Sequence, residues 1–489
     1  MEKLPEARLY INGEIRSASN GKTFDNICPW TGEVIGQAAD ATAEDVNAAI
    51  IAARRAFDTT DWSVQHQFRF ELLQKYQALI KTNRNKLMTV ARNEAGAAIG
   101  AACLAHVDGA IAAMDGLMEC FSEVQWEEKK GRKETYGFVS ERIVVKEATG
   151  VVGAITPWNV PLYINIEKIF CALLAGCTVV MKPAPDTPYM SSFLGELAIE
   201  AGFPAGVLNV ITSLDPAMAG EMLVTDPRVD VISFTGSTGI GKRIMEKGAP
   251  TLKRVFLELG GKSVNLITDD VPNFAEVVAR GMVLMHAGQG CAIPTRMLVP
   301  KSRYAEACKI LEAAYASVGD NWGDYNNPKH IMGPVISKKQ MERVKGYIDI
   351  GIQEGARLLA GGKIRADKGS GFFIEPTCFV DVNNNMRIAR EEIFGPVLVA
   401  IPFEDEEDAI RIANDSDYGL GGMVTAGTDE RAMRIARRIR AGAIAVNGGM
   451  SIAGDLPFGG YKQSGIGRAW GREGIEDFLE TKAIAIRVS

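Results

Sequence analysis

The regular exchange of short apolar runs and helical patterns from residue 151 onward most limits how this chain can fold. VVGAIT (151–156) and CTVVMK (177–182) are β-like, and the helix-like segment PLYINIEKIFCALLAG (161–176) lies between them. Further β-like runs follow at 206–211 and 229–234. Apolar strands joined by helices form parallel sheets covered on both faces. We therefore predict an α/β fold, with ligands at the carboxyl ends of its strands.

The segments around this core predict three further parts. Helical patterns extend to about residue 124, and the first, at 41–57, begins with a capping box of Thr42 and Asp45. The charged and then alternating stretch 127–148 predicts a hairpin that extends from the body. A second α/β segment from about 260 predicts helices at 272–286 and 302–316 with a strand at 296–300. The tail, 481–489, alternates like an edge strand that is available to pair, including with another subunit.

Composition narrows the possible partners and the compartment. A net charge of −6 over 489 residues argues against nucleic-acid or anionic-membrane binding, which needs a basic face. The uncharged stretch 148–166 contains two prolines and an asparagine, so we expect no membrane span. The first residues do not form a signal peptide. Eight scattered cysteines without a CxxC pair indicate free thiols, and the four dispersed histidines predict no metal site. We expect a cytoplasmic protein.

Six short motifs together identify a family. Alone, a glycine-rich turn is usually an ordinary loop, and a single cysteine is usually inert core. The motifs are TPWN (156–159), MKPAP (181–185), FTGSTGIG (234–241), LELGGK (257–262), GQGC (288–291) and EEIFGP (391–396). In this order and at these spacings they resemble the aldehyde dehydrogenase superfamily, and the resemblance extends from about residue 10 to 485.

The resemblance implies an architecture. It comprises a Rossmann-like cofactor domain (1–126 and 148–259), an α/β catalytic domain (260–458) and a β oligomerisation arm (127–147 and 475–489). An arm with exposed strand edges needs a partner, so we expect a homodimer or a homotetramer.

The resemblance also implies the reaction and its catalytic residues. Cys291 matches the nucleophile, which attacks an aldehyde to give a hemithioacetal and then a thioester. Asn159 matches the oxyanion donor, together with the backbone N–H of Cys291. Glu258 matches the general base that activates water to hydrolyse the thioester. Lys182 completes the set and matches the contact to the adenosine ribose.

The implied cofactor is NAD, with NADP not excluded. Pro185 stands where NAD-preferring relatives often carry a glutamate that repels a 2′-phosphate. The residues that the resemblance assigns to cofactor binding are Thr156, Pro157, Trp158, Lys182, Pro185, Gly236, Ser237, Glu258, Leu259, Glu392 and Phe394.

The implied substrate pocket departs from the family pattern. Val160 and Ile452 replace common aromatic residues, and Glu167 stands where tryptophan or arginine is frequent. Smaller walls favour bulky apolar or aromatic aldehydes, whereas Glu167 disfavours a carboxylated one. The full set of pocket residues is Val160, Tyr163, Ile164, Glu167, Ile293, Ile452 and Phe458. His286 stands where asparagine is usual, and both a packing role and a role in shaping the pocket remain open.

Three other functions compete with hydrolytic aldehyde oxidation. A CoA-acylating relative would tend to lack the general base, which is present here as Glu258. A non-enzymatic binding protein on the same fold would usually lose the thiol or the base. A cysteine hydrolase would need a histidine partner for Cys291, and His286 is only five residues away in the sequence.

Overall fold

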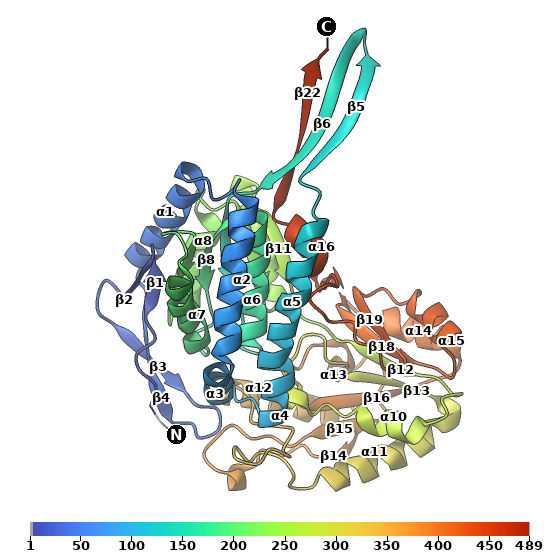
Figure 1. Cartoon of the computed structure of the whole chain (residues 1–489). Helices are drawn as coiled ribbons and strands as arrows, with labels where there is room; N and C mark the ends of the chain where they lie inside the picture. Colours follow the sequence, from blue (N-terminus) through green and yellow to red (C-terminus); the bar gives the residue numbers. More distant parts are fainter. Residues whose placement is uncertain (1–2, 489) are drawn as a thin grey trace.

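The computed structural model describes residues 3–488, apart from the side chains of 101–104. It contains two α/β bodies side by side and a narrow β arm that extends from one of them (Figure 1). The order of strands in the first sheet is β2 (Glu14–Arg16), β1 (Leu9–Ile11), β9 (Leu208–Val210), β8 (Thr178–Lys182), β7 (Val151–Ile155), β10 (Val231–Thr235), β11 (Arg254–Glu258) and β21 (Gly465–Ile466).

The centre of the first sheet, from β9 to β11, is parallel as predicted. Successive residues of its strands enter two different cores. Val179 packs in the core formed with α2, α5, α6 and α7, and Val180 packs in the core formed with α1 and α8. The helices of this body are α1 (Ala43–Thr59), α2 (His66–Thr82), α3 (Arg84–Glu94), α4 (Ile99–Ala101), the π-helical turn η1 (Ala102–Asp108), α5 (Gly109–Cys120), α6 (Pro161–Ala175), α7 (Pro188–Ala201), α8 (Pro216–Thr225), α9 (Thr238–Gly248) and α16 (Gly471–Glu476).

The second sheet is parallel except for its edge strand β14. Its order is β14 (Arg357–Ala360), β15 (Thr377–Val380), β16 (Val397–Phe403), β13 (Arg296–Pro300), β12 (Val264–Ile267), β18 (Gly421–Thr425) and β19 (Ala443–Val446). The helices around it are α10 (Phe274–Arg280), α11 (Tyr304–Val318), α12 (Lys338–Gln353), α13 (Arg387–Arg390), α14 (Glu406–Asn414) and α15 (Asp429–Ala436). Two separate two-stranded pairs complete the structure, β3 (Thr23–Ile27) with β4 (Val34–Ala39) and β17 (Tyr418–Gly419) with β20 (Tyr461–Lys462).

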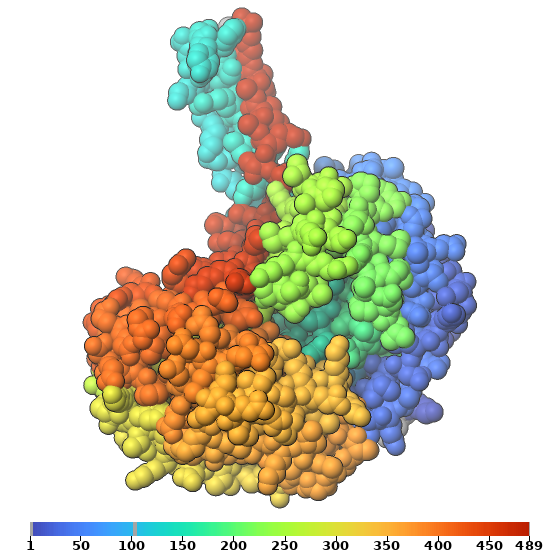
Figure 2. All heavy atoms as spheres, turned by 180° about the vertical axis from the view of Figure 1, so that it is seen from behind, coloured from blue at the N-terminus to red at the C-terminus, as the bar shows by residue number. Residues whose placement is uncertain are grey.

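The arm is a three-stranded antiparallel sheet. The predicted hairpin is confirmed as β5 (Glu127–Thr135) and β6 (Phe138–Ala148), and the tail strand β22 (Leu479–Arg487) pairs with β6 along its whole length. The tail strand therefore pairs with a strand of its own chain. Figure 2 shows the arm standing clear of the body, with both its hairpin and its tail in open space.

One helix prediction was wrong. The expected helix at 272–286 ends at Arg280, and residues 285–288 form a separate turn in which His286 and Ala287 have left-handed backbone angles. Gly281, which follows the helix, packs so closely that a Cβ there would lie 2.2 Å from Met297. The chain therefore leaves the helical path at Gly281. The capping box of Thr42 and Asp45 is confirmed.

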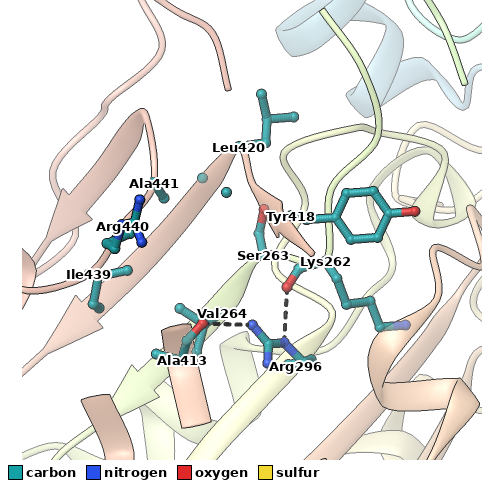
Figure 3. Close-up of a pocket in the computed structure, with 12 residues that line it drawn as sticks. Lys262, Ser263, Val264, Arg296, Ala413, Tyr418, Leu420, Ile439, Arg440 and Ala441 are labelled. Carbon is teal, nitrogen blue, oxygen red and sulfur yellow. Dashed lines mark hydrogen bonds between the residues drawn. The ribbon is translucent and has the colours of Figure 1, made fainter. Parts of the chain in front are cut away.

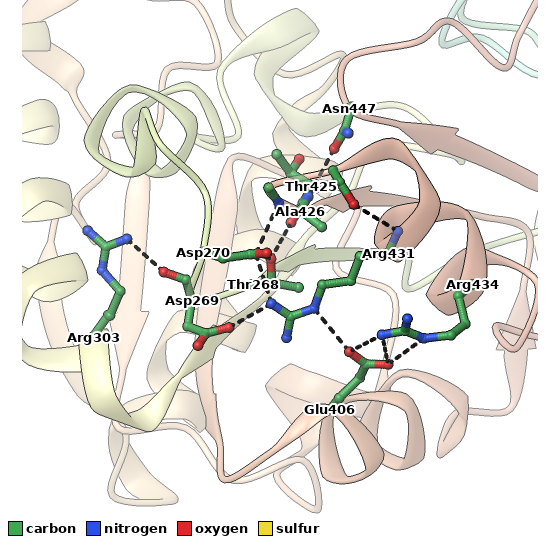
Figure 4. A network of polar contacts seen from close by, with 12 residues as sticks. Thr268, Asp269, Asp270, Arg303, Glu406, Thr425, Ala426, Arg431, Arg434 and Asn447 are labelled. Carbon is green, nitrogen blue, oxygen red and sulfur yellow. Dashed lines mark hydrogen bonds and ion pairs between the residues drawn. The ribbon is translucent and has the colours of Figure 1, made fainter.

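An ionic network fixes the chain after β12 to α14 and α15 (Figure 4). Arg431 pairs with Asp269, Asp270 and Glu406, and Glu406 also binds Arg434. Because these side chains are half-exposed, each pair contributes at most about 1 kcal/mol to stability. The network lies on the outside of the second body, away from the motifs that carry chemistry. Within residues 3–488, no helix is both long and apolar enough to cross a membrane.

Candidate active site

Four of the sequence motifs begin where parallel strands of the first sheet end. Ile155 of β7 is paired with Lys182 of β8 and with Phe234 of β10, and Thr235 is paired with Glu258 of β11. TPWN, MKPAP, FTGS and LELGG therefore emerge from one edge of the sheet. This carboxyl edge is where α/β proteins bind ligands.

The loop that carries the thiol is held in an unusual backbone conformation. His286, Ala287 and Gly288 all have positive φ, at 48°, 51° and 71°. Gly288 is required because a Cβ there would lie 2.0 Å from the carbonyl oxygen of Gly395. Gln289 is fully buried; its amide donates to the His286 carbonyl over 3.1 Å and accepts from the backbone N–H of Ile336 over 2.8 Å.

LELGGK, GQGC and EEIFGP meet around Gly261. A Cβ at Gly261 would lie 2.6 Å from the carbonyl oxygen of Cys291, so only glycine allows this approach. The Gly261 N–H donates to Glu392 over 3.0 Å. Segments separated by up to about 130 residues in sequence thus form one site.

Cys291 and Glu258 are neighbours at the centre of this site, and each side chain shifts the pKa of the other. Burial raises the pKa of Glu258 to about 8, and the nearby Glu167 adds to the rise, whereas Lys168 and the neighbouring thiol oppose it. Burial and the neighbouring carboxylate raise the pKa of Cys291 well above its ordinary value. One oxygen of Glu258 has no hydrogen-bond partner among the described residues. At neutral pH the thiol and most of the Glu258 carboxyl are therefore protonated, and Glu258 becomes a proton acceptor for the thiol as the pH rises through about 8.

Asn159 lies in the loop between β7 and α6 with 3% of its surface exposed. Its backbone adjoins the ring of His286, so this loop lies against the thiol loop. Within residues 3–488 the side-chain amide forms no hydrogen bond. It therefore remains available as a donor.

The residues expected to hold a cofactor lie around the same sheet edge. Lys182 is 2% exposed, and its Nζ donates to the Pro183 carbonyl over 3.1 Å. Burial lowers the pKa of Lys182 to about 8. Ser237 is exposed and caps the N-terminus of α9 by accepting from the backbone N–H of Ile240.

The other expected cofactor residues frame the space between the two bodies. The rings of Trp158 and Phe394 meet edge to face at 5.3 Å. Leu259 donates its backbone N–H to Ser464 over 2.9 Å. Thr156 follows β7, Gly236 follows β10, and Pro157 and Pro185 are half-buried in the loops after β7 and β8.

The expected pocket residues do not all pack against the same core. Tyr163, Ile452 and Phe458 pack in or against the same core cluster as Cys291. Ile293 instead packs against the core of the second sheet, on the far side of the thiol loop. Val160 is half-buried at the start of α6, and Ile164 is buried in its first turn.

Glu167 forms an ion pair inside the protein. It is 4% exposed and pairs over 3.3 Å with Lys168, which is fully buried and also donates to Ser233 over 3.1 Å. The charge of Glu167 is therefore compensated inside the protein, so it offers less repulsion to a carboxylated substrate than an unpaired carboxylate would.

Sequence reasoning missed two residues that shape this site, Lys168 and Gln289. Lys168 contacts β10 through Ser233, and its Nζ lies 4.8 Å from the ring of Phe256, two residues before Glu258 on β11. Two adjacent charges inside the otherwise apolar segment 161–176 were the signal for Lys168. Gln289 lies within GQGC, and no local pattern indicates its distant partner.

A small cavity lies behind the LELGGK glycines, between Lys262, Arg296 and the segment 418–421 (Figure 3). Its volume of about 10 Å³ has room for roughly one water molecule, not for an aldehyde. Burial and the neighbouring Arg296 lower the pKa of Lys262 to about 7. This cavity is therefore too small to be the substrate site, and the residues that line it support the loops of the site.

We expect Arg296→Met to destabilise the protein by roughly 3–5 kcal/mol, because a buried charged group leaves several acceptors unpaired. Arg296 is 2% exposed and donates to the side chain of Asn384 and to the carbonyls of Lys262, Ile412 and Ala413. The measurement is the midpoint of thermal or urea unfolding.

Arg434→Met is the matched control for that experiment. Arg434 is an arginine of the second body that is 59% exposed and paired with Glu406. Its loss should cost less than about 1 kcal/mol. Equal destabilisation by the two substitutions would contradict the role assigned to Arg296.

Comparison with known proteins establishes the family. The family model described as the aldehyde dehydrogenase family matches residues 15–484. The chain belongs to this family. A putative aldehyde dehydrogenase of Staphylococcus epidermidis is 39% identical over 98% of both chains. A 3-succinoylsemialdehyde-pyridine dehydrogenase of a Pseudomonas species is 40% identical over 97% of this chain and 98% of that protein.

Solved aldehyde dehydrogenase structures share the fold. The Mycobacterium tuberculosis aldehyde dehydrogenase complexed with NAD⁺ has a TM-score of 0.93 at 40% identity, covering 99% of this chain and 98% of that one. A cysteine-to-alanine variant of Pseudomonas syringae aldehyde dehydrogenase C, complexed with NAD⁺ and octanal, has a TM-score of 0.90 at 37% identity over 98% and 96%. The predicted fold class is confirmed.

Proposed function

We propose that this chain oxidises an aldehyde to a carboxylic acid with NAD as the acceptor, by way of a thioester on Cys291. The observation that supports this proposal best is the proximity of Cys291 to Glu258, which brings a nucleophile next to a buried carboxyl group. Family membership supports the same reaction class.

The chain's own residues account for the proton transfers. The thiol of Cys291 adds to the aldehyde carbon as Glu258 takes its proton. The amide of Asn159 and the Cys291 N–H donate to the resulting alkoxide. NAD, when bound, supplies the hydride acceptor that makes this an oxidation. Glu258 loses this first proton to solvent, then takes a proton from the water that hydrolyses the thioester and passes it to the departing Cys291 thiolate, which releases the acid and restores the thiol.

The cofactor residues fit a dinucleotide. Thr156 and Thr235, at the ends of β7 and β10, each have a buried hydroxyl with no partner in the described part of the chain. Lys182, at the end of β8, lies at the same sheet edge. The exposed N-terminus of α9 at Ser237 favours a phosphate because of its free N–H groups and helix dipole. Glu392 is placed to accept from a ribose hydroxyl.

The preference between NAD and NADP depends on the loop after β8. Pro185 supplies no carboxylate, and Asp186 is half-buried, with burial raising its pKa. The loop therefore holds no strong barrier against a 2′-phosphate. The NAD⁺ complexes of the M. tuberculosis and P. syringae relatives favour NAD.

The proposed substrates are aldehydes with a bulky apolar or aromatic body. Val160 and Ile452 leave more room than aromatic residues would, and Tyr163 and Phe458 offer aromatic surface. One relative is named for a pyridine-bearing semialdehyde, and another was crystallised with octanal. Both agree with this choice.

The proposed domain boundaries follow the two sheets. Residues 1–126 and 148–259 form the cofactor domain, 260–458 the catalytic domain, and 127–147 with 475–489 the oligomerisation arm; residues 1, 2 and 489 lie outside the described part of the chain. The two sheets support this division, and the short strand β21 shows that the chain returns to the first sheet after 458. Tyr136, Phe138 and Ile486 are exposed on the arm, which supports a homodimer or homotetramer.

A panel of aldehydes tests the proposed function. Octanal, benzaldehyde, an aminoaldehyde and succinate semialdehyde are each assayed with NAD and with NADP by the absorbance of the reduced nicotinamide. We expect the highest kcat/KM with octanal or benzaldehyde and NAD. Succinate semialdehyde as the best substrate would contradict the pocket assignment. Formation of an acyl-CoA when CoA is added would favour the CoA-acylating alternative.

A further inference from the structure

Two histidines that the proposed mechanism does not use meet directly beside the thiol loop. His106 lies in the π-helical turn η1, and His286 lies in the turn that precedes GQGC. Their ring centroids are 4.4 Å apart, and their planes are nearly perpendicular, at 79°. Their exposed fractions are 0% and 3%. π-Helical turns occur frequently at functional sites.

The pair consists of neutral rings that contact each other without conventional hydrogen bonds. None of the four ring nitrogens has a hydrogen-bond partner within the described part of the chain. Burial lowers the pKa of His286 to about 4 and that of His106 well below its ordinary value, and His286 further disfavours a charge on His106. The perpendicular arrangement is the edge-to-face geometry that aromatic rings prefer. The ring contact is therefore the interaction between these two side chains.

His286 connects this contact to both catalytic loops. Its backbone starts the left-handed turn of 286–288, a conformation that costs energy for a residue such as Ala287 and needs outside support. The ring of His286 adjoins the backbone of Asn159, and this backbone opposes the lowering of the His286 pKa. A ring fixed by His106 thus borders the thiol loop on one side and the loop of the oxyanion donor on the other.

We propose that the His106–His286 pair is a positioning element that sets the Cys291 loop against the Asn159 loop. Neither histidine touches the reacting atoms. His106 acts at a distance, by holding the ring of His286, which in turn keeps the turn of 286–288 in its left-handed form. The inference rests on the proposed function, because it assigns to the pair the alignment of that function's nucleophile and oxyanion donor.

A double-mutant cycle tests this proposal. His106→Ala is made in the natural chain and in a His286→Asn background, because asparagine tolerates the left-handed conformation but lacks the ring. The readouts are the rate of the first turnover in stopped flow and the rate of Cys291 alkylation by iodoacetamide, with KM for NAD and the melting temperature measured beside them.

We expect His106→Ala to slow both reactions roughly tenfold to a hundredfold in the natural chain, because a small misplacement of reacting groups has effects of this size. In the His286→Asn background the same substitution should have no further effect. His106→Phe, which keeps a ring of similar shape, should restore the rates. KM for NAD should not change.

His330→Ala is the matched control. His330 is also buried, at 8% exposed, but it lies in the second body, where its Nδ1 accepts from the backbone of Asp324 over 3.0 Å. It should leave both rates unchanged. Equal slowing by His106→Ala in the two backgrounds, or a fall in melting temperature without a change in either rate, would overturn the proposal.

The alkylation measurement separates this proposal from the proposed function. It needs neither an aldehyde nor a cofactor, so it reports on the Cys291 loop even if no aldehyde is turned over. Failure of the aldehyde panel together with an intact coupling between His106 and His286 would refute the reaction but support the positioning role.

Discussion

Cys291→Ala is expected to abolish aldehyde oxidation, with a loss of at least about 10⁴-fold in kcat, because no other group can form the thioester. The thiol of Cys291 lies beside Glu258, and its backbone carbonyl packs against Gly261. The folded structure should persist, since the side chain is partly exposed and the loop is fixed by Gln289. The measurement is steady-state formation of reduced nicotinamide, with the dissociation constant of NAD measured separately.

Cys308→Ala is the control for that substitution. Cys308 is another partly exposed free thiol, on α11, where it lies beside Tyr304. It should keep full activity and the same dissociation constant for NAD. Residual oxidation by Cys291→Ala above about one part in a hundred would show that another residue can act as the nucleophile.

Glu258→Gln is expected to separate the two halves of the reaction. The first turnover should still release one equivalent of reduced nicotinamide, but more slowly, because the thiol remains and must lose its proton to water instead of to Glu258. Subsequent turnovers should slow by roughly 10²–10⁴-fold, because no base activates the water. Stopped-flow absorbance measures both phases. Loss of the first equivalent together with the later turnovers would mean that Glu258 is essential for attack by the thiol as well.

The pH profile gives an independent test of Glu258. A base works only when it is deprotonated, so turnover should be present above its pKa and fall below it. Burial raises this pKa to about 8, so kcat should rise with pH through about 8, and this limb should be missing in Glu258→Gln. Glu94→Gln is the matched control, because burial also raises the pKa of Glu94 to about 8 while its carboxylate accepts from Tyr189 and Met190 at the start of α7. The rise of kcat with pH through about 8 should remain in Glu94→Gln.

Much of the fold was predictable because it depends on local patterns. The strands that end at Ile155, Lys182 and Glu258 are short apolar runs, and burial on both faces requires such runs. The helix that follows TPWN could be located from Pro161 at its first position. The relative order of the motifs then placed their residues at one sheet edge.

The details that decide the chemistry depend on contacts between distant segments. The left-handed turn of 286–288 contacts His106 through the ring of His286 and Gly395 through Gly288. These partners lie 180 residues before His286 and 109 after it, so no short window of sequence contains all of them. For the same reason a helix was predicted where the chain turns. The pairing of Glu167 with Lys168 was likewise not predictable, because it depends on the burial of α6 in the folded chain.

The burial of Cys291 beside Glu258 also bears on how this chain withstands oxidants. Peroxides attack thiolates far faster than thiols, so a cysteine with a raised pKa is slow to form a sulfenic acid. The carboxylate that accepts the thiol proton during attack also keeps the sulfur protonated beforehand. Between turnovers, the reactive sulfur is therefore kept in its least oxidisable form without a second cysteine to protect it.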